Sequence, residues 1–390
     1  MKSGDTALFR CGDTFFGALR PPCGKSFEKK TTLSFYGKGK NPVISQYKKA
    51  KHTAWEKYSE GVFRLDLSDS SNFSGNVFDL DTSVGFIKAS GKIYYRNRKS
   101  CDELLENWDF FCDGKYVYVF LPENPTEFSQ DILFACNIRM IRPADHLVIK
   151  GLSFVGTGGH GFQGVTHDCV ISDCSFCELG GSFMLDEHGV PTKIRYGNGV
   201  ECWTGSRDVL VENCFFRDIY DVAMSIQGWR AVTNWENIVF RHNTVKNCTQ
   251  SFEIWTKPEK EHTGIVNCFF EYNTCIDSGY GWGFAARPDK AQACHLLIYH
   301  RECEFCDIHI RNNTFINAAG CVIFKSGGVG EIPHDYKVYG NRIIHDAKKP
   351  IVFRWEDTDE NDYIEYENEL LKNNEFYDIK DFDSEKEKLS

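Results

Sequence analysis

Short runs of alternating apolar and polar residues recur along the chain between residues 148 and 343. Strict alternation over a few residues is typical of a β-strand with one buried face. Equivalent positions of successive runs are about 22 to 40 residues apart, a period typical of the coils of a solenoid. Seven runs share this pattern: 148–154, 170–176, 210–216, 239–245, 269–275, 309–315 and 337–343.

One column through these runs predicts a stack of polar side chains inside the repeat. Its members are Leu152, Cys174, Cys214, Asn243, Asn273, Asn313 and Asn341. We expect the four asparagines to form a ladder at a turn, because each side chain can bond the backbone of the next coil.

A second family of strand-like segments lies between these runs, so each coil is expected to contain at least two strands. Its members are 199–203, 222–227, 251–255, 281–285, 321–325 and 351–355. The pattern predicts an all-β protein, a right-handed parallel β-helix with a β-rich insertion in its N-terminal third. The expected parts are N-terminal coils at 1–46, the insertion at 47–137, the main coils at 138–356 and an acidic C-terminal tail at 357–390.

Composition narrows the choice of partners and compartment. The net charge of the 390 residues is −10, and no basic run exists, so nucleic acid is not an expected partner. No apolar stretch is long enough to span a membrane. No signal peptide is visible at the N-terminus. The sequence as it stands therefore favours the cytoplasm, and a truncated N-terminus would favour an extracellular protein. The composition predicts no oligomeric state.

The 17 cysteines are interpreted as reduced core residues, which also favours the cytoplasm. Two pairs, Cys174 with Cys177 and Cys303 with Cys306, have the spacing of zinc ligands. Their strand context and intervening phenylalanines favour core packing, so no metal site is predicted.

Three features carry a family resemblance: the coils at 146–355, the opening glycine, aspartate and threonine motifs at 4–17, and the segment Asn-Pro-Val-Ile-Ser at 41–45. With them, the chain resembles the pectate-lyase-like superfamily of carbohydrate-active β-helix proteins, which includes glycoside hydrolases, polysaccharide lyases and epimerases. The resemblance implies the fold and a saccharide substrate. It assigns no catalytic residue.

Alternation places a candidate site on the outer face of the second strand family. Successive side chains of a strand point to opposite faces, so Glu201 and Glu253 point away from the core at equivalent positions, with Ser225 between them. A parallel column holds Trp203, Gln227 and Trp255. With strands about 4.8 Å apart, the two glutamate backbones would be separated by about 9.6 Å. Asp221, which begins the middle strand, offers a closer carboxylate partner.

The predicted chemistry is that of a sugar site. Paired carboxylates can supply a general acid and a base or nucleophile, and tryptophan faces can stack on sugar rings. An outward glutamate is often only solvated surface, whereas outward tryptophans beside it indicate a binding surface. Further substrate-binding candidates are Tyr280, Trp282, Arg287 and His160, and the connection at 180–196 is expected to form one wall.

Three functions remain open from the sequence. The first is a glycoside hydrolase that uses Glu201, Glu253 and Asp221 and requires no cofactor. The second is a polysaccharide lyase or uronate epimerase, which needs a cation such as Arg287, Lys325 or bound calcium to stabilise the substrate carboxylate. The third is a glycan-binding β-helix without catalysis. All three expect an oligo- or polysaccharide partner.

Overall fold

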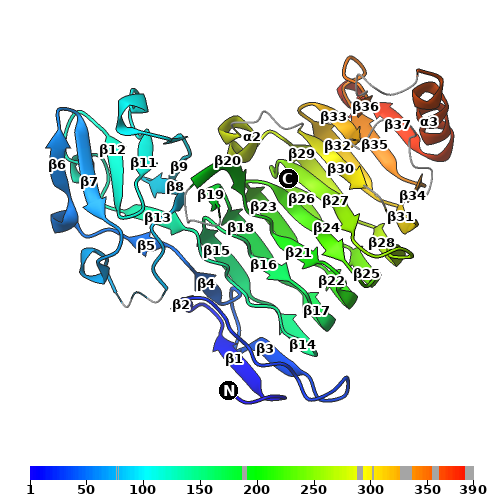
Figure 1. Cartoon of the computed structure of the whole chain (residues 1–390), viewed down its shortest axis with the longest axis horizontal. Coiled ribbons are helices and arrows are strands. Elements are labelled where there is room, and N and C mark those ends of the chain that lie inside the picture. Colours follow the sequence, from blue (N-terminus) through cyan, green and yellow to red (C-terminus); the bar gives the residue numbers. More distant parts are fainter. Residues whose placement is uncertain are drawn as a thin grey trace.

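Three parallel sheets wind around one elongated core, and together they form a parallel β-helix (Figure 1). The computed structural model describes residues 1–75, 77, 79–186, 191–287, 293–300, 303–325, 336–353 and 360–382. Each complete coil contributes one strand to each sheet, so coils have three strands rather than the minimum of two expected from the sequence. The predicted fold class is confirmed.

The first sheet has nine strands and the second has ten, and both are parallel. The first sheet contains β1 (Thr6–Arg10), β3 (Thr31–Tyr36), β14 (Leu147–Lys150), β17 (His167–Ser172), β22 (Arg207–Glu212), β25 (Trp235–Arg241), β28 (Ile265–Glu271), β31 (Cys306–Arg311) and β34 (Tyr336–Tyr339). The second contains β2 (Thr14–Phe16), β4 (Val43–Ser45), β15 (Ser153–Thr157), β18 (Ser175–Leu179), β23 (Phe215–Ile219), β26 (Thr244–Lys246), β29 (Thr274–Ser278), β32 (Thr314–Ala318), β35 (Arg342–His345) and β37 (Glu375–Asp378).

The third sheet has seven strands and carries the candidate site. They are β16 (Phe162–Gly164), β21 (Val200–Trp203), β24 (Val222–Ala231), β27 (Gln250–Pro258), β30 (Cys294–His300), β33 (Cys321–Lys325) and β36 (Val352–Phe353). One prediction in this family is wrong. Residues 281–285 lie in or beside helix α2 (Trp282–Ala286), and the strand of that coil is β30. Residues 354–355 of the last predicted segment lie outside the described residues.

Each of the seven repeated runs crosses a sharp corner between the first and second sheets. At the corner, residues such as Asp173, Asn213 and Asn312 adopt a left-handed backbone with φ near +55°. Aspartate and asparagine tolerate this conformation better than most residues with a side chain. The corner turns the chain abruptly, so one run supplies two strands.

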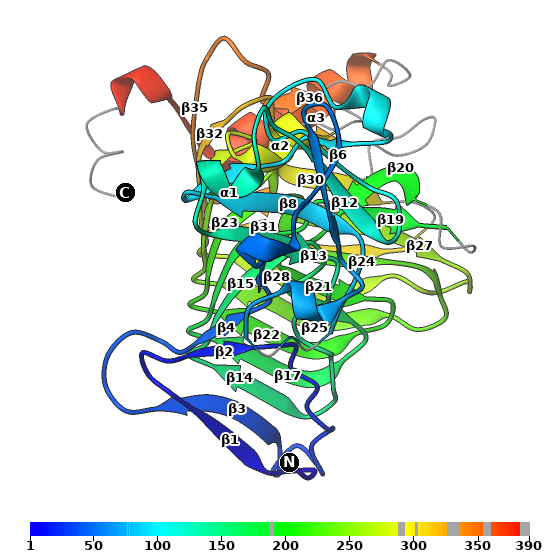
Figure 2. The ribbon, with the colours of Figure 1, turned by 90° about the vertical axis from the view of Figure 1, so that its left-hand side faces the viewer.

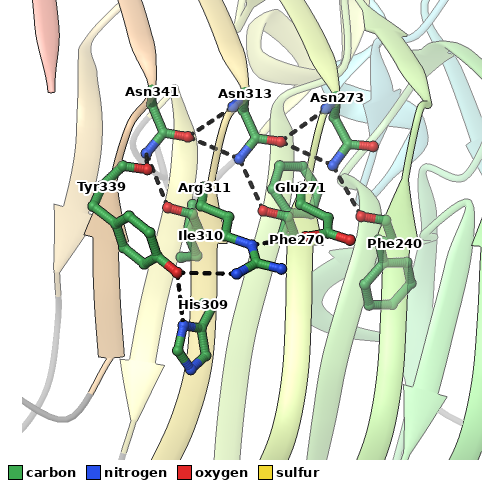
Figure 3. A network of polar contacts seen from close by, with 10 residues as sticks. All are labelled: Phe240, Phe270, Glu271, Asn273, His309, Ile310, Arg311, Asn313, Tyr339 and Asn341. Atoms are coloured by element: carbon green, nitrogen blue, oxygen red, sulfur yellow. Dashed lines mark hydrogen bonds and ion pairs between the residues drawn. The ribbon is translucent and has the colours of Figure 1, made fainter.

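The predicted asparagine ladder stands directly after this corner and is confirmed (Figure 3). Asn273 Nδ2 donates to the carbonyl of Phe240 at 3.1 Å and to Asn313 Oδ1 at 3.0 Å. Its Oδ1 accepts from the backbone N–H of Asn243 at 3.0 Å. The same contacts join Asn313 to Asn341, and the ladder continues to Asn374. Each buried amide is therefore satisfied by the neighbouring coil.

The insertion leaves the coils after β4 and returns before β14 (Figures 1 and 2). It has its own apolar core and two sheets. One sheet contains β10 (Asn97–Arg98), β11 (Phe110–Cys112), β12 (Tyr116–Phe120), β7 (Val62–Asp66) and β6 (Glu56–Ser59). The other contains β5 (Lys48–Lys49), β13 (Ile132–Cys136), β8 (Val84–Ala89) and β9 (Lys92–Tyr94). The short helix α1 spans Pro125–Phe128, and 3₁₀ turns span His52–Ala54, Ser70–Asn72 and Cys101–Glu103.

The C-terminal segment, expected as an acidic tail, contains ordered structure. Helix α3 (Glu360–Asn373) packs Tyr366 and Leu370 against the main core, and β37 pairs with β35 at the end of the second sheet. A 3₁₀ turn at Ile379–Asp381 follows. Residues 357–359 and 383–390 lie outside the described residues. Among the described residues, no helix combines the length and apolar character needed to cross a bilayer.

Candidate active site

A cavity of about 730 Å³ lies on the outer face of the third sheet, where β16, β21, β24 and β27 run side by side. Eight of the ten sequence-predicted site residues line it: Glu201, Glu253, Asp221, Trp203, Gln227, Trp255, Arg287 and His160. Eight further residues line the cavity: Met184, Ile194, Arg195 and Tyr196 lie in the connection at 180–196 that was expected to form a wall, and Asn137, Arg139, Gln163 and Asn198 were not predicted.

The strand register at the cavity is the one that alternation predicts. Glu201 pairs with Ser225, which pairs with Glu253 on the following strand. In the parallel column, Trp203 pairs with Gln227 and Gln227 with Trp255. The rings of Trp203 and Trp255 stack on each other, with ring centroids 6.3 Å apart and an interplanar angle of 26°. The cavity thus has an acidic row and an aromatic row.

The two glutamates are not solvated surface residues. Glu201 is only 2% exposed and Glu253 only 8%, because the walls of the cavity enclose them. The β19 (Ser182–Leu185) and β20 (Pro191–Tyr196) hairpin supplies part of one wall, and residues 187–190 between these strands lie outside the described residues. Burial of a carboxyl group without a matching cation favours its neutral form.

Glu201 is the carboxyl group best poised for proton transfer. Burial is the largest cause that raises its pKa, from 4.5 to about 7, and the nearby Asp221 adds to the rise. Hydrogen bonds from Asn198 and Gln163 act in the opposite direction, with Asn198 Nδ2 lying 2.6 Å from Glu201 Oε2. Gln163 reaches Glu201 because β16 pairs with β21 at that position.

Glu253 and Asp221 form a second pair of acids with unequal surroundings. Burial raises the pKa of Glu253 well above its ordinary value, followed by repulsion from Asp221 and then Glu201. Gln227 Nε2 donates to Glu253 Oε2. Asp221 instead forms an ion pair with the Arg287 guanidinium, which favours its charged form. We therefore assign the neutral state to Glu253 and the carboxylate state to Asp221.

His160 is held neutral beside Glu201. Burial, aided by Arg139, lowers the pKa of His160 to about 3. Its Nδ1 accepts from the backbone N–H of Asn198 at 3.0 Å and lies 3.5 Å from Glu201 Oε2. The proton of the neutral ring is therefore on Nε2, which makes His160 a hydrogen-bond donor rather than a base at neutral pH.

The insertion is fastened to the hairpin wall by Arg195. Its Nη2 donates to the Gly85 carbonyl at 2.9 Å, and its Nη1 donates to the carbonyls of Tyr95 at 3.2 Å and Ala286 at 2.7 Å. Its Nε donates to the Gly181 carbonyl at 2.6 Å. One buried guanidinium thus joins the insertion, the hairpin and α2.

Two predicted substrate-binding residues do not line the cavity. Trp282 begins helix α2, donates from Nε1 to the Asp218 carbonyl at 3.0 Å and packs its ring against Phe86 of the insertion. Tyr280 is exposed and hydrogen-bonds Asn317 and Lys349. The prediction treated 281–285 as a strand, and α2 instead directs Trp282 into packing. Lys325, a cation considered for a lyase, is also absent from the lining residues.

The missed residues come from two sources. Gln163 could have been found, because Phe162-Gln163-Gly164 repeats the alternation of Val200-Glu201-Cys202 one coil earlier. Asn137 and Arg139 follow the last strand of the insertion, where the chain rejoins the coils. Ile141 pairs in parallel with Phe162 of β16, and Tyr196 Oη donates to Asn137 Oδ1 at 2.6 Å.

Two other cavities among the described residues lack the combination of buried acids and stacked tryptophans. Cavities of about 650 and 690 Å³ lie between β11 and the hairpin and among the loops that follow the third sheet. Neither contains two buried carboxyl groups beside an aromatic pair. Within the described part of the chain, no group of three or more histidine, cysteine or acidic side chains is arranged to hold a metal ion. All 17 cysteines are free, and most are buried.

Comparisons with known proteins give only distant likenesses. No protein-family model matches the chain, and no curated protein matches it. Among solved structures, XylC in complex with xylose has a TM-score of 0.48 at 10% identity over 95% of this chain and 78% of that one. A glycoside hydrolase has a TM-score of 0.38 at 9% identity, over 96% and 88% of the two chains. The GH136 lacto-N-biosidase from Eubacterium ramulus has 0.36 at 10%, over 96% and 62%. Likenesses this distant assign neither a family nor an activity.

Proposed function

We propose that the protein is a carbohydrate-active enzyme, a glycoside hydrolase that cleaves an oligo- or polysaccharide in the cavity on the third sheet. The observation that carries the proposal is the pair of unlike acids beside the stacked tryptophans Trp203 and Trp255. Glu201 has a pKa of about 7, whereas Asp221 is paired with Arg287. Environments that separate two carboxyl groups in this way supply one proton donor and one base or nucleophile.

The proposed roles follow from these protonation states. Glu201 donates its proton to the glycosidic oxygen as the bond to the leaving sugar breaks, because a general acid works best with a pKa near the operating pH. Asp221 either activates the attacking water or attacks the sugar carbon itself. Glu253, neutral and hydrogen-bonded to Gln227, donates to a sugar hydroxyl. Trp203 and Trp255 bind the apolar faces of the rings.

A polysaccharide lyase is the second candidate, and Arg139 favours it. Arg139 lines the cavity and is exposed, and no ion pair or hydrogen bond of its side chain occurs among the described residues. Together with Arg195 and Arg287 it gives the cavity three guanidinium groups, against one carboxylate when Glu201 and Glu253 are neutral. A lyase needs such a cation to stabilise the charge that develops on a uronate carboxylate.

Three variants and two readouts test the proposal. Glu201→Gln, Asp221→Asn and Glu253→Gln would be assayed with the wild type on a glycan panel for new reducing ends and for the ultraviolet absorbance of unsaturated products. We expect new reducing ends from the wild type, with rates at least about 100-fold lower for the first two variants. Unsaturated product would support the lyase, and glycan binding measured calorimetrically, with no product in either assay, would support a glycan-binding protein. Activity unchanged in all three variants would contradict this site.

A further inference from the structure

The outer face of the third sheet extends beyond the cavity along β24. Gln227 lines the cavity, Gly228 is buried, and Trp229 is again exposed. Gly228 has a φ of +143°, yet β24 stays paired with β27 residue by residue from Gln227 to Trp229, which keeps Trp229 two residues beyond Gln227 in the sheet. Trp229 is 51% exposed, which is unusual for the largest aromatic side chain.

The surface between the acids and Trp229 is one continuous stretch of paired strand. β24 and β27 remain in register from Ser225 opposite Glu253, through Gln227 opposite Trp255, to Trp229 opposite Lys257. Trp229 lies four residues beyond Ser225, which corresponds to about 13 Å along a parallel strand. That backbone length exceeds one sugar ring, which places the acids and Trp229 against different rings of an extended chain.

The ring of Trp229 has a neighbouring cation. The guanidinium of Arg230 lies 4.8 Å from its ring centroid, and a cation over an aromatic face is attractive. Trp229 lies two residues along β24 from Gln227, beside the row of Trp203 and Trp255, and an exposed aromatic side chain in such a position is typical of a binding surface.

We propose that Trp229 is the stacking platform of a distal sugar subsite, and that the substrate is a saccharide chain of several rings lying along β24. The inference rests on the proposed function, because it takes the cavity to be a saccharide site. It also gives the bound saccharide a direction along the strands. The reacting ring lies on the row of Glu201 and Glu253, the next ring lies on the row of Trp203 and Trp255, and a more distant ring stacks on Trp229.

Chain-length dependence of binding tests the distal subsite. Xylo-, cello- and galacturono-oligosaccharides of two to six rings would be titrated calorimetrically into protein carrying Glu201→Gln, with and without Trp229→Ala. We expect Trp229→Ala to weaken binding of the longer oligosaccharides by roughly 2- to 10-fold and to leave two-ring ligands unchanged. Trp229→Phe should retain most of the affinity. Tyr36→Ala, at a residue on the first sheet that is also 51% exposed, is the matched control and should bind like the parent.

The outcomes separate this inference from the proposed function. Equal affinities with and without Trp229, equal losses for short and long ligands, or no binding of any series would overturn the distal subsite. Cleavage by the wild type with no effect of Trp229→Ala contradicts the subsite alone. A chain-length effect of Trp229→Ala in a protein that cleaves none of the ligands supports the subsite and contradicts the hydrolase.

Discussion

Replacement of Glu201 by glutamine should make the folded protein more stable at alkaline pH than the wild type. The pKa of Glu201 is about 7 in the folded protein, against an ordinary value of 4.5. A carboxyl group with a raised folded pKa stabilises the folded state least at high pH, because the unfolded chain can ionise while the folded chain must keep the proton or bury a charge. Stability is therefore lost as pH rises from about 4.5 to about 7, and glutamine removes this loss.

The size of the effect follows from the same two pKa values. Between pH 5 and pH 8 they correspond to roughly 2–3 kcal/mol of unfolding free energy lost by the wild type and not by Glu201→Gln. With an unfolding entropy of about 2.1 cal/mol/K for each residue, the Tm difference between the variant and the wild type should grow by about 3 °C between these pH values. Glu253 and Asp221 are present in both proteins, so the comparison reports Glu201 together with its repulsion of Glu253.

The assay is thermal unfolding of the wild type and Glu201→Gln at pH 5 and pH 8, at one protein and salt concentration. Glu212→Gln is a suitable control, because Glu212 lies on the first sheet in a surface ion pair with Arg241. A Tm difference between Glu201→Gln and the wild type that is the same at both pH values would refute the raised pKa of Glu201. The role of this residue as a general acid at neutral pH would then lose its basis.

Four further predictions concern the pH dependence of the rate, the tryptophans Trp203 and Trp255, the asparagine ladder and the contacts of Arg195. Because Glu201 must hold its proton to act as an acid, kcat/KM should fall about tenfold per pH unit above pH 7, and a flat profile to pH 9 would exclude it as the acid. Trp255→Ala should raise KM by roughly 2- to 10-fold with a smaller effect on kcat, whereas an equal loss in both would indicate a disrupted site. Asn273→Ala should lower the free energy of unfolding, measured by denaturant titration, by about 2–3 kcal/mol, because it leaves the Asn243 N–H and the Phe240 carbonyl unpaired. Asn374→Ala, at the end of the ladder, should lower it by less. Arg195→Lys should lower the free energy of unfolding by about 2 kcal/mol and speed proteolysis of the insertion, because lysine cannot donate to four carbonyls. Unchanged proteolysis would contradict the role of Arg195 in fastening the insertion to the hairpin.

Most of the site could be predicted from the sequence because a parallel coil repeats its register. Once Val200 and Phe252 are placed in the core, Glu201 and Glu253 must occupy one column and Trp203 and Trp255 the next. The asparagine ladder follows from the same repetition. Patterns of period two therefore carry information across coils that are distant in the chain.

The rest could not be predicted where the chain leaves that repetition. The segment 281–285 mimics alternation, yet it forms α2 inside a longer excursion between β29 and β30. Asn137 reaches the cavity where the insertion returns to the coils, and Arg139 precedes Ile141, which joins the third sheet by a single bridge to Phe162, too short a pattern to recognise in the sequence. Burial of the glutamates also depends on these walls, so alternation alone could place Glu201 but not its pKa.

The most direct test of the account is the structure of the Glu201→Gln variant with a bound oligosaccharide. We predict a saccharide chain on the third sheet, with a glycosidic oxygen within hydrogen-bond distance of residue 201, the carboxylate of Asp221 on the same ring, and neighbouring rings stacked on Trp203 and Trp255. A saccharide bound in the cavity between β11 and the hairpin, or a chain that contacts neither residue 201 nor Asp221, would contradict the assignment of this cavity as the active site.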